Sequence, residues 1–358
     1  MTVVLGWDIG GANIKLTVIR CKGNAVSGVK IFAEYFPIWK RGREKLSYKL
    51  KSMVERVGFA RPDLAAITMT AELSDVYFSK REGVNHIIDS VEKAMPTLDL
   101  RFLDVHGRLL TPDEARKHPL KVAAANWYAS GWLASKLSNT CLLVDTGSTS
   151  TSIVPVVEGK VVAKGLNDLE KLMAGELVYT GALRTNVAAI VSHVPVRGVS
   201  TPVSSEFFAQ SGDIHLLLGH ITAEDYTVDT PDGRGVSMVE AAARVARVVC
   251  ADLDLLSMEE VKTIASYVYE AQLGQILEAL KRLTNSLRVD LRTSPAYVAG
   301  VGGEFIALPA LKMFGFRNVK PLSRFIGSEA AKATPSYALA LMAAEFLEGR
   351  ELRNWRLS

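Results

Sequence analysis

The chain has 358 residues, of which 48% are hydrophobic and 22% are charged, and its formal net charge is +4. This length favours two domains over one small core, and the composition is that of an ordinary globular protein. The basic excess is too small to argue for binding to nucleic acid, and we expect no nucleic-acid partner. We interpret the densest basic run, Lys40–Lys51, as the solvated face of a helix.

The cysteines and the apolar runs indicate the cellular location of the protein. Cys21, Cys141 and Cys250 stand far apart in apolar surroundings, so we expect reduced core thiols, with no disulfide or metal site. Asp8 falls where the apolar part of a signal peptide would lie, and no apolar run is long enough to span a bilayer. The sequence therefore predicts a soluble, cytoplasmic protein without a membrane partner, and it leaves the oligomeric state open.

The first part of the chain alternates strand and helix patterns. We predict strands at Val3–Trp7, Lys15–Arg20, Val29–Phe36, Leu64–Thr70 and Arg101–Asp104, and helices at Glu44–Val57, Val84–Met95 and Leu120–Leu137. A turn with two glycines separates the first two strands. The last helix is long, apolar and rich in small residues.

The opening pattern then returns. An apolar strand ends in Asp145, a turn of Gly, Ser and Thr residues follows, and a second strand covers Ser152–Val157 before the hairpin turn at Glu158–Gly159. Strand, aspartate, glycine turn and strand thus occur at Asp8 and again at Asp145. We interpret the two halves as duplicated folding units.

The remainder is mainly helical. The region 166–231 mixes short apolar stretches with loop residues and predicts no clear element. Beyond it we predict helices at Val236–Asp252, Glu259–Leu287 and Pro335–Glu348, a strand at Asn318–Pro321, and a strand, glycine turn and helix around Gly300. Thr334 is the expected N-cap of the last helix.

Three glycine turns suit a phosphate ligand. Glycine leaves room for backbone amides to converge on an anion, and "DTGSTST" from Asp145 adds hydroxyl groups. "GVGGEF" from Gly300 precedes a helix, whose N-terminus favours negative charge. A turn without a ligand is the alternative for each one alone. Three in this order, with aspartate at two strand ends, predict a phosphate-binding protein.

These motifs resemble those of a superfamily. "DIGGANIK", "DTGSTST" and "GVGGE" are similar to the first phosphate, second phosphate and adenosine motifs of actin-like ATPases. The resemblance implies an α/β fold with two ribonuclease H-like lobes around a central cleft. We expect the lobes to cover residues 1–138 plus 335–358, and 139–334, with Leu120–Leu137 and Pro335–Glu348 as crossing connectors.

A closer resemblance covers Leu5 to about Ala340. "GWDIGGANIK", "MTAELSD", "AAANWYASGW", "VDTGSTSTSIVPV" and "GELVYTGALRT" are similar to the hydantoinase/oxoprolinase-related proteins of tetrahydromethanopterin-linked one-carbon metabolism. The archaeal members of that family are synthases of methanofuran biosynthesis. The resemblance implies a transferase that joins an aminomethylfuran-methyl diphosphate to the phenol of γ-glutamyltyramine as an ether and releases diphosphate.

The resemblance also implies a ligand-binding set. Mg²⁺ would be held at Asp8 and Asp145, with water as further ligands. The residues expected to bind phosphate oxygens are Gly10, Gly11, Asn13, Lys15, Gly147, Ser148, Thr149, Gly300, Gly302 and Gly303. For Lys15 the alternative is a solvated lysine at a strand end. Arg184 and Thr185 would hold a substrate carboxylate, since the guanidinium fork matches that group.

Several carboxylates are candidates for acid–base chemistry. Glu72 and Asp75 follow a strand that we expect to be buried, where side chains of α/β lobes commonly face a crevice. Either is a candidate general base or second metal ligand, and the alternative is a pair of acids at a helix start. Asp225 is a further candidate that rests on the resemblance.

Other conspicuous side chains have simpler interpretations. Trp127 and Trp132 lie on an apolar helix and are expected in the core. His215 and His220 are five residues apart and do not share one face of a helix, so we assign them no metal site.

One departure from the family pattern bears on the alternatives. The second phosphate motif of the family has an aspartate where this chain has Ser152. The difference disfavours an ATP hydrolase. An ATP-dependent kinase or oxoprolinase-like hydrolase, and a non-enzymatic nucleotide-binding protein, remain the alternatives to the synthase. ATP is possible as a ligand and is not required by the synthase, whose expected partners are small molecules.

Overall fold

The computed structural model describes residues 1–58, 62–287 and 289–356. The chain divides into two compact units. Unit 1 holds Met1–Leu143, Val154–Lys171 and Leu322–Ser358, and unit 2 holds Val144–Ile153 and Leu172–Pro321. The lobe boundaries expected from the sequence remain a prediction.

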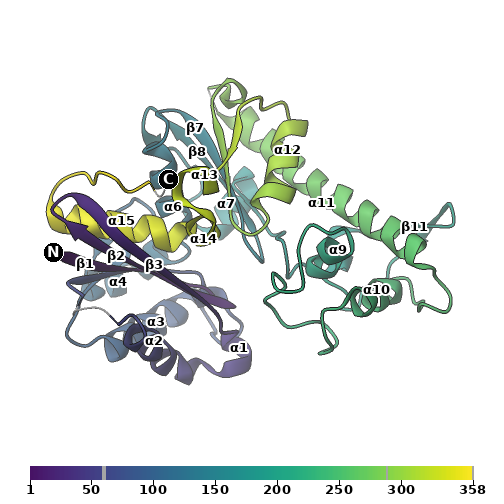
Figure 1. The fold of residues 1–358 in the computed structure, drawn as a ribbon, viewed down its shortest axis with the longest axis horizontal. Helices are drawn as coiled ribbons and strands as arrows, with labels where there is room; N and C mark the ends of the chain where they lie inside the picture. The colour runs from purple at the N-terminus through teal and green to yellow at the C-terminus, as the bar shows by residue number, and fades with distance from the viewer. Residues whose placement is uncertain (59–61, 288, 357–358) are drawn as a thin grey trace. The chain divides into compact units, whose positions relative to one another are not determined.

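A six-stranded sheet organises unit 1, with strand order β3-β2-β1-β4-β5-β6 (Figure 1). Its strands are β1 (Thr2–Ile9), β2 (Asn13–Lys22), β3 (Ala25–Tyr35), β4 (Leu64–Met69), β5 (Asp99–Leu103) and β6 (Leu109–Leu110). β1, β2 and β3 form an antiparallel meander, whereas β4 runs parallel to β1 and β5 runs parallel to β4. The carboxyl ends of β1 and β4 therefore meet at one edge of this sheet.

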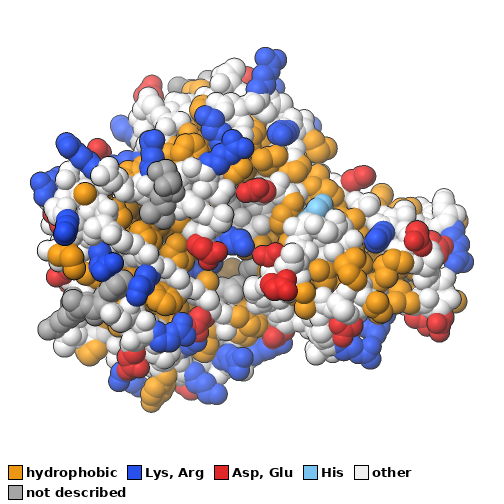
Figure 2. Space-filling model, in the orientation of Figure 1, with side chains coloured by type: hydrophobic (Ala, Val, Ile, Leu, Met, Phe, Trp, Pro, Cys, Tyr) orange, Lys and Arg blue, Asp and Glu red, His pale blue; other side chains and the backbone are white. Residues whose placement is uncertain are grey.

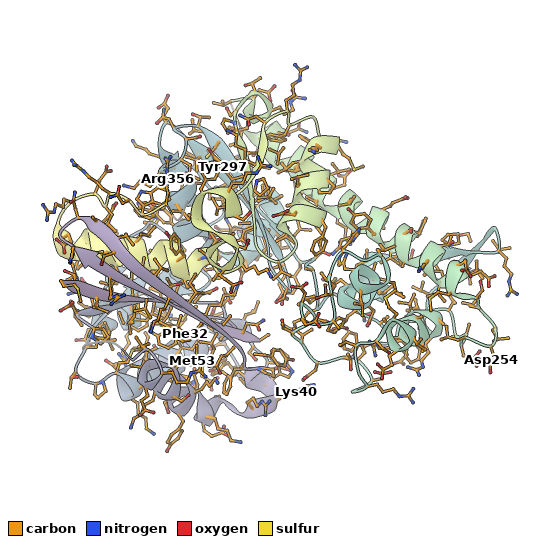
Figure 3. The ribbon with its side chains drawn as sticks, viewed as in Figure 1. Phe32, Lys40, Met53, Asp254, Tyr297 and Arg356 are labelled. Atoms are coloured by element: carbon orange, nitrogen blue, oxygen red, sulfur yellow. The ribbon has the colours of Figure 1, made fainter. Side chains whose placement is uncertain are left out.

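Helices of unit 1 are mostly short. They are α1 (Ile38–Arg41), α2 (Leu46–Glu55), α3 (Lys80–Ala94), α4 (Pro112–Lys117), α5 (Pro119–Val122), α6 (Asn126–Ser135), α13 (Ser323–Ile326), α14 (Ser328–Lys332) and α15 (Thr334–Glu348), with 3₁₀ turns at Arg43–Lys45 and Ala71–Leu73. α2 and α3 pack on one face of the sheet, where alternate residues of β1 join a continuous apolar core. Phe32 of β3 and Met53 of α2 lie on this side (Figure 3).

The other face of β1 is covered by α15 at very short range. A β-carbon on Gly6 would lie 2.2 Å from the carbonyl oxygen of Ser336 and 2.5 Å from the amide nitrogen of Ala340. Only glycine permits this approach. Because side chains alternate along a strand, Asp8 lies on the same face as Gly6.

The second sheet has the strand order β10-β8-β7-β13-β14, and β9 also pairs with β8. Its strands are β7 (Cys141–Thr146), β8 (Thr151–Val157), β9 (Lys160–Val161), β10 (Leu177–Val178), β13 (Ala296–Ala299) and β14 (Val319–Pro321). The order β9-β8-β7-β13-β14 repeats β3-β2-β1-β4-β5 of the first sheet. The duplication predicted from the two aspartate motifs is thus confirmed at the level of strand order.

Unit 2 is dominated by a 29-residue helix, α11 (Met258–Ser286), against which α9 (Ser211–Leu217) and α10 (Met238–Arg247) pack (Figure 1). The remaining elements of this part of the chain are α7 (Asp168–Ala174), α8 (Val187–Ile190), the hairpin β11 (His193–Val196) and β12 (Val199–Pro202), the 3₁₀ turn Leu291–Thr293, the π-helix Gly303–Ala307 and α12 (Leu308–Met313). α7 crosses the division between the units.

The prediction of one long helix at Leu120–Leu137 is wrong. The chain forms α5, then a break at residues 123–125, then α6. Ala124 has a φ of 49°, which a right-handed helix excludes, and Ala123 makes a parallel bridge to Met69 at the end of β4. Alanine gives no local signal for such a break, because the tertiary bridge imposes it.

Two smaller expectations also differ from the structure. Thr334 does not cap α15, because its hydroxyl donates to the carbonyl of Ala331 and α15 begins at Thr334 itself. Cys250 is exposed, whereas Cys21 and Cys141 are buried free thiols as expected. Cys250 stands just beyond α10 with a φ of 57°, outside the regular helix that the sequence predicted there.

Basic and acidic side chains are mixed on the surface, as the similar numbers of the two kinds in the sequence lead us to expect. Figure 2 shows Lys and Arg side chains interspersed with Asp and Glu side chains on this face. Within the ranges that the structure describes, no helix has both the length and the apolar character needed to cross a membrane.

The contact between α15 and β1 predicts a large effect of one methyl group. Gly6→Ala should lower the free energy of unfolding by about 1–3 kcal/mol or more, because the new β-carbon overlaps backbone atoms that cannot rotate away. Gly274→Ala is the matched control: Gly274 lies inside α11, and apart from the adjacent backbone of that helix no atom of the described residues stands within 4 Å of the place its β-carbon would take, so alanine should be neutral or stabilising there. Urea unfolding measures both, and an unchanged Gly6→Ala variant would contradict the packing.

Candidate active site

Each of the two aspartate motifs folds into a tight turn, and the two turns have the same form. Asp8 lies near the end of β1 and Asp145 near the end of β7. Two residues after each aspartate, a glycine amide donates to the carbonyl three residues further on: Gly10 to Asn13 at 3.0 Å, and Gly147 to Ser150 at 2.9 Å. These two amides are therefore engaged within their turns.

Asp8 is a buried carboxylate with an unsatisfied oxygen. Its side chain is 7% exposed, and its Oδ1 has no hydrogen-bond partner among the described residues. Burial raises the pKa of Asp8, and the cross-strand ammonium of Lys15 counteracts part of that rise. An orphaned carboxylate oxygen suits a bound cation, which would compensate the charge that burial disfavours.

Lys15 is not a freely solvated lysine. Its Nζ donates to the carbonyl oxygen of Lys332 at 2.8 Å, two residues before the start of α15. Because Lys15 is the register partner of Asp8, its side chain stands on the same face of the sheet. The structure thus brings Asp8, Lys15 and the beginning of α15 together at one edge of unit 1.

In unit 2 the third glycine turn packs directly on the second. Gly300 has a φ of 79°, and a β-carbon there would lie 2.5 Å from Oδ1 of Asp145 and 2.3 Å from the carbonyl oxygen of Thr146. The amide of Gly302 donates to the same carbonyl at 2.9 Å. A π-helix beginning at Gly303 follows, where the sequence predicted an ordinary helix. Two motifs 155 residues apart, counting from Asp145 to Gly300, therefore form one backbone cluster.

The segment 180–185 wraps the turn after Asp145. The amides of Ala182, Leu183 and Arg184 donate to the carbonyls of Gly147 or Ser148 at 2.9–3.0 Å. The guanidinium of Arg184 donates to Oγ1 of Thr149 at 3.0 Å. Arg184 therefore lies against the predicted phosphate-binding turn.

Thr185 is used differently from what the sequence suggested. Its hydroxyl accepts from the amide of Gly181 at 2.9 Å, and its side chain is buried. Asp225 accepts from the amide and hydroxyl of Thr222 and so closes a local turn in unit 2. Substrate contact by Thr185 and an acid role for Asp225 remain predictions.

Glu72 differs sharply from its neighbour Asp75. Glu72 is 1% exposed, whereas Asp75 is exposed. Neither carboxylate oxygen of Glu72 makes a hydrogen bond to any residue that the structure describes, although the amides of Glu72 and Ala124 lie nearby. Burial raises the pKa of Glu72 to about 8, while the ammonium of Lys80 lowers it and the carboxylate of Asp168 raises it. Of the two predicted acids, Glu72 is the buried one, and its role in proton transfer remains a prediction.

The helices α3 and α7 contribute the residues near Glu72. The first turn of α3 touches it closely, since a β-carbon on Gly83 would lie 2.6 Å from the carbonyl oxygen of Glu72. Lys80 stands three residues before Gly83 and so on the same face of α3. Its Nζ lies 2.5 Å from Oδ2 of Asp168, at the start of α7. This ion pair couples α3 to α7 beside Glu72.

α7 contributes a further charge. Lys171 is 1% exposed, and its Nζ lies 3.7 Å from the centre of the Trp127 ring. Trp127 is buried, as predicted, whereas Trp132 is partly exposed. Lys80, Asp168 and Lys171 were not predicted as site residues. The only sequence signal was the three-residue spacing of Asp168 and Lys171, which is common on solvated helices.

The metal prediction rests on few ligands. In residues 1–58, 62–287 and 289–356 no group of three or more His, Cys, Asp or Glu side chains is arranged to hold a metal ion. Mg²⁺ needs no such cage, because it usually keeps several waters and takes one or two carboxylates plus substrate oxygens. Asp8 and Asp145 as metal ligands remain predictions, which the orphaned oxygen of Asp8 supports.

Comparison with solved structures identifies the class of fold. The nucleotide-free structure of acetone carboxylase, from work on ATP-dependent acetone carboxylation, matches 95% of this chain and 70% of its own with a TM-score of 0.58 and 11% sequence identity. The expected actin-like ATPase fold is thereby confirmed. At this identity the similarity concerns the fold alone.

The chain belongs to the hydantoinase/oxoprolinase family, whose model matches residues 63–346. A curated relative from Methanocaldococcus jannaschii is 38% identical over 97% of this chain and 99% of its own, and is named (4-{4-[2-(gamma-L-glutamylamino)ethyl]phenoxymethyl}furan-2-yl)methanamine synthase. A relative of the same name from Methanococcus vannielii is 34% identical over 59% of this chain and 94% of its own. The family predicted from the sequence motifs is confirmed.

The buried carboxyl of Glu72 predicts an unusual pH dependence of stability. Its pKa is raised from 4.5 to about 8 in the folded protein, so the folded state holds the proton more tightly than the unfolded state. The free energy of unfolding should therefore fall as the pH rises from about 4.5 to about 8. Glu72→Gln removes this titration and should stabilise the protein at pH 7.5 by about 2–4 kcal/mol.

Urea unfolding between pH 5 and pH 8 measures this slope. Asp75→Asn is the control, because Asp75 is exposed and its replacement should leave the slope as in the parent protein. A Glu72→Gln variant whose stability declines with pH as steeply as the parent would show that Glu72 does not carry the effect.

Proposed function

We propose that the protein is a synthase that joins an aminomethylfuran-methyl diphosphate to the phenol of γ-glutamyltyramine. The ether is the group named in the relative that covers 97% of this chain. The carbon–oxygen bond to the diphosphate breaks with its electron pair leaving on the diphosphate. The phenol oxygen bonds to the same carbon, and the phenol proton passes to a base of the enzyme. Two needs follow: a site for the leaving diphosphate and a base beside the phenol.

Glu72 carries the proposal as the base. A phenol loses its proton near pH 10, so an ordinary carboxylate is a poor acceptor for it. The pKa of about 8 makes the Glu72 carboxylate a stronger base, better matched to a phenol. Burial also removes competing water from the carboxylate, whose oxygens have no partner within the described structure.

Each aspartate turn is, by itself, a candidate site for the leaving diphosphate. In unit 1 the turn after Asp8 lies at the end of β1, and Glu72 follows the adjacent parallel strand β4. Both therefore belong to the carboxyl edge of one sheet, where ligands bind in α/β folds. Asn13, Lys15 and the amide of Gly11 are the candidate donors to phosphate oxygens there, and Mg²⁺ held at Asp8 would neutralise part of the diphosphate charge.

In unit 2 the turn after Asp145 supplies an equivalent cradle. Ser148 and Thr149 offer hydroxyl groups, and Arg184 adds a guanidinium that already contacts Thr149. A guanidinium is suited to phosphate as well as carboxylate oxygens. We assign Arg184 to the diphosphate in preference to a substrate carboxylate.

A direct assay tests the reaction. The purified protein is incubated with Mg²⁺, γ-glutamyltyramine and the aminomethylfuran-methyl diphosphate, and ether and pyrophosphate are measured by mass spectrometry and a coupled assay. We expect both products in equal amounts without ATP. A parallel incubation with ATP·Mg tests the kinase or hydrolase alternative. Phosphate release from ATP, with no ether formed in either incubation, would overturn the synthase.

Asp8→Asn should reduce turnover by at least two orders of magnitude, because it removes the charge directed at the metal and diphosphate. The fold should persist, since a neutral amide is easier to bury than the unsatisfied carboxylate. Circular dichroism checks the fold, and Asp99→Asn at the exposed start of β5 is the control. Full activity of Asp8→Asn would make Asp8 a structural residue.

The ion pair beside Glu72 predicts opposite shifts of the pH–rate profile. In the parent protein kcat/KM should rise with pH through about 8, as Glu72 becomes ionised. Lys80→Met removes a cation and should move this rise to higher pH, whereas Asp168→Asn removes an anion and should move it to lower pH. Both changes break the same ion pair, so general destabilisation cannot produce shifts of opposite sign. Shifts in one direction would contradict the role of Glu72.

A further inference from the structure

A pair of histidines lies in unit 2, outside the glycine-turn motifs, with His215 buried and His220 partly buried. Nδ1 of His215, on α9, is 3.0 Å from Nδ1 of His220. The ring of His215 is fully buried against Phe305 and Tyr269, with ring centres 4.7 Å and 5.8 Å away. The chain reversal after α9 brings the two rings together although their spacing does not fit one helix face.

Gln272 of α11 connects this pair to the backbone. Its Oε1 is 2.9 Å from Nε2 of His215, and its Nε2 donates to the hydroxyl of Thr180 and to the carbonyl of Gly181, each at 2.9 Å. Gln272 is 1% exposed. Inside the protein its amide nitrogen therefore makes two hydrogen bonds and its amide oxygen makes one.

The chemistry of these groups fixes the direction of every hydrogen bond. A carbonyl oxygen only accepts, so the nitrogen of Gln272 must face Gly181 and its oxygen must face His215. Nε2 of His215 therefore carries a hydrogen. Burial lowers the pKa of His215 to about 3, so the ring is neutral and its Nδ1 accepts from Nδ1–H of His220. Protonation of His220 leaves this donor in place.

The residues held by Gln272 support the turn after Asp145. A β-carbon on Gly181 would lie 2.6 Å from the amide nitrogen of Thr149, so Gly181 lies directly against the turn. The carbonyl of Thr180 accepts from the hydroxyl of Thr151 at 2.8 Å, at the start of β8. The next three residues hold the carbonyls of Gly147 and Ser148, as described above. Through its hydrogen bonds to Thr180 and Gly181, Gln272 thus anchors the segment that packs against this turn.

We propose that Gln272 and His215 are positioning residues that hold the glycine turn after Asp145 in the shape that binds diphosphate. The inference rests on the proposed function only in naming diphosphate as the ligand. Gln272 does not touch the ligand; it locks Thr180 and Gly181, which lock the turn. His215 keeps the side-chain amide of Gln272 in the one orientation that can donate to Gly181.

Gln272→Leu tests the anchor, since leucine fills a similar volume and makes no hydrogen bond. Hydrogen–deuterium exchange of the purified protein should show faster exchange of the amides of Ala182, Leu183 and Arg184, which donate to the turn. Affinity for Mg²⁺-pyrophosphate, measured by calorimetry, should fall about tenfold or more because two hydrogen bonds that hold the turn are lost. KM for the diphosphate substrate should rise with a smaller change in kcat.

Gln275→Leu is the matched control on the same helix. Gln275 donates to the carbonyl of Ala189 at 3.3 Å, and among the described residues it has no hydrogen bond to the segment 180–185. Its replacement should leave exchange and pyrophosphate affinity unchanged. Similar effects of both leucine variants would mean that helix packing alone is responsible, and would overturn the inference.

Gln272→Glu gives a signature that a purely structural role would not. A protonated glutamic acid can accept from His215 and donate to Gly181, whereas the ionised form cannot donate. Pyrophosphate affinity of this variant should therefore recover as the pH falls, while Gln272→Leu stays weak at every pH. Unchanged exchange in Gln272→Leu would overturn the inference. Failure of the parent protein to bind pyrophosphate, with faster exchange in Gln272→Leu, would overturn the proposed function alone.

Discussion

The position of each predicted phosphate-binding group depends on one backbone constraint, a tight turn that closes immediately after an aspartate near the end of a strand. Strand pairing fixes Asp8 opposite Lys15, and the bond from Gly10 to Asn13 reverses the chain within four residues. The turn after Asp145 closes in the same way. In unit 2 this turn also serves as a platform, because the Gly300 turn and the segment 180–185 both pack on it without space for a side chain. A change in the turn would therefore displace every group built on it.

Unit 1 buries two carboxylates, and this burial opposes folding because it removes the groups from water. Asp8 and Glu72 lie at the carboxyl edge of the same sheet, and both have oxygens without partners in the described part of the chain. Folding alone gives no reason for such groups, since an apolar or amide side chain would be easier to bury. A ligand cation at Asp8 and a substrate proton at Glu72 would supply the missing partners. Under the proposed function, this arrangement is a site completed by its ligands, and charges of both signs, on Lys80 and Asp168, lie beside Glu72.

Local features were predictable and long-range ones were not. Most strands outside residues 166–231, the glycine turns, and the helices α2, α3, α10, α11 and α15 followed from periodicity and from glycine, and their ends differ from the prediction by a few residues. The short elements within 166–231 were not predicted. The break at Ala124 was missed because alanine favours helix and only the bridge to Met69 prevents it. The bonds of Lys80 to Asp168 and of Gln272 to Gly181 span 88 and 91 residues, and no local pattern marks either pair. Glu72 and Asp75 looked equivalent in sequence, and only burial separates them.

The thiols differ in a way that offers a means of observing the protein at work. Cys21 and Cys141 are buried, and desolvation raises their pKa values to about 11 and about 12, so neither forms a reactive thiolate near neutral pH. Cys250 is exposed at the end of α10. Maleimide reagents should therefore attach a single fluorophore or spin label to unit 2 without any engineered cysteine. A second label introduced into unit 1 would then report on the distance between the units as ligands bind.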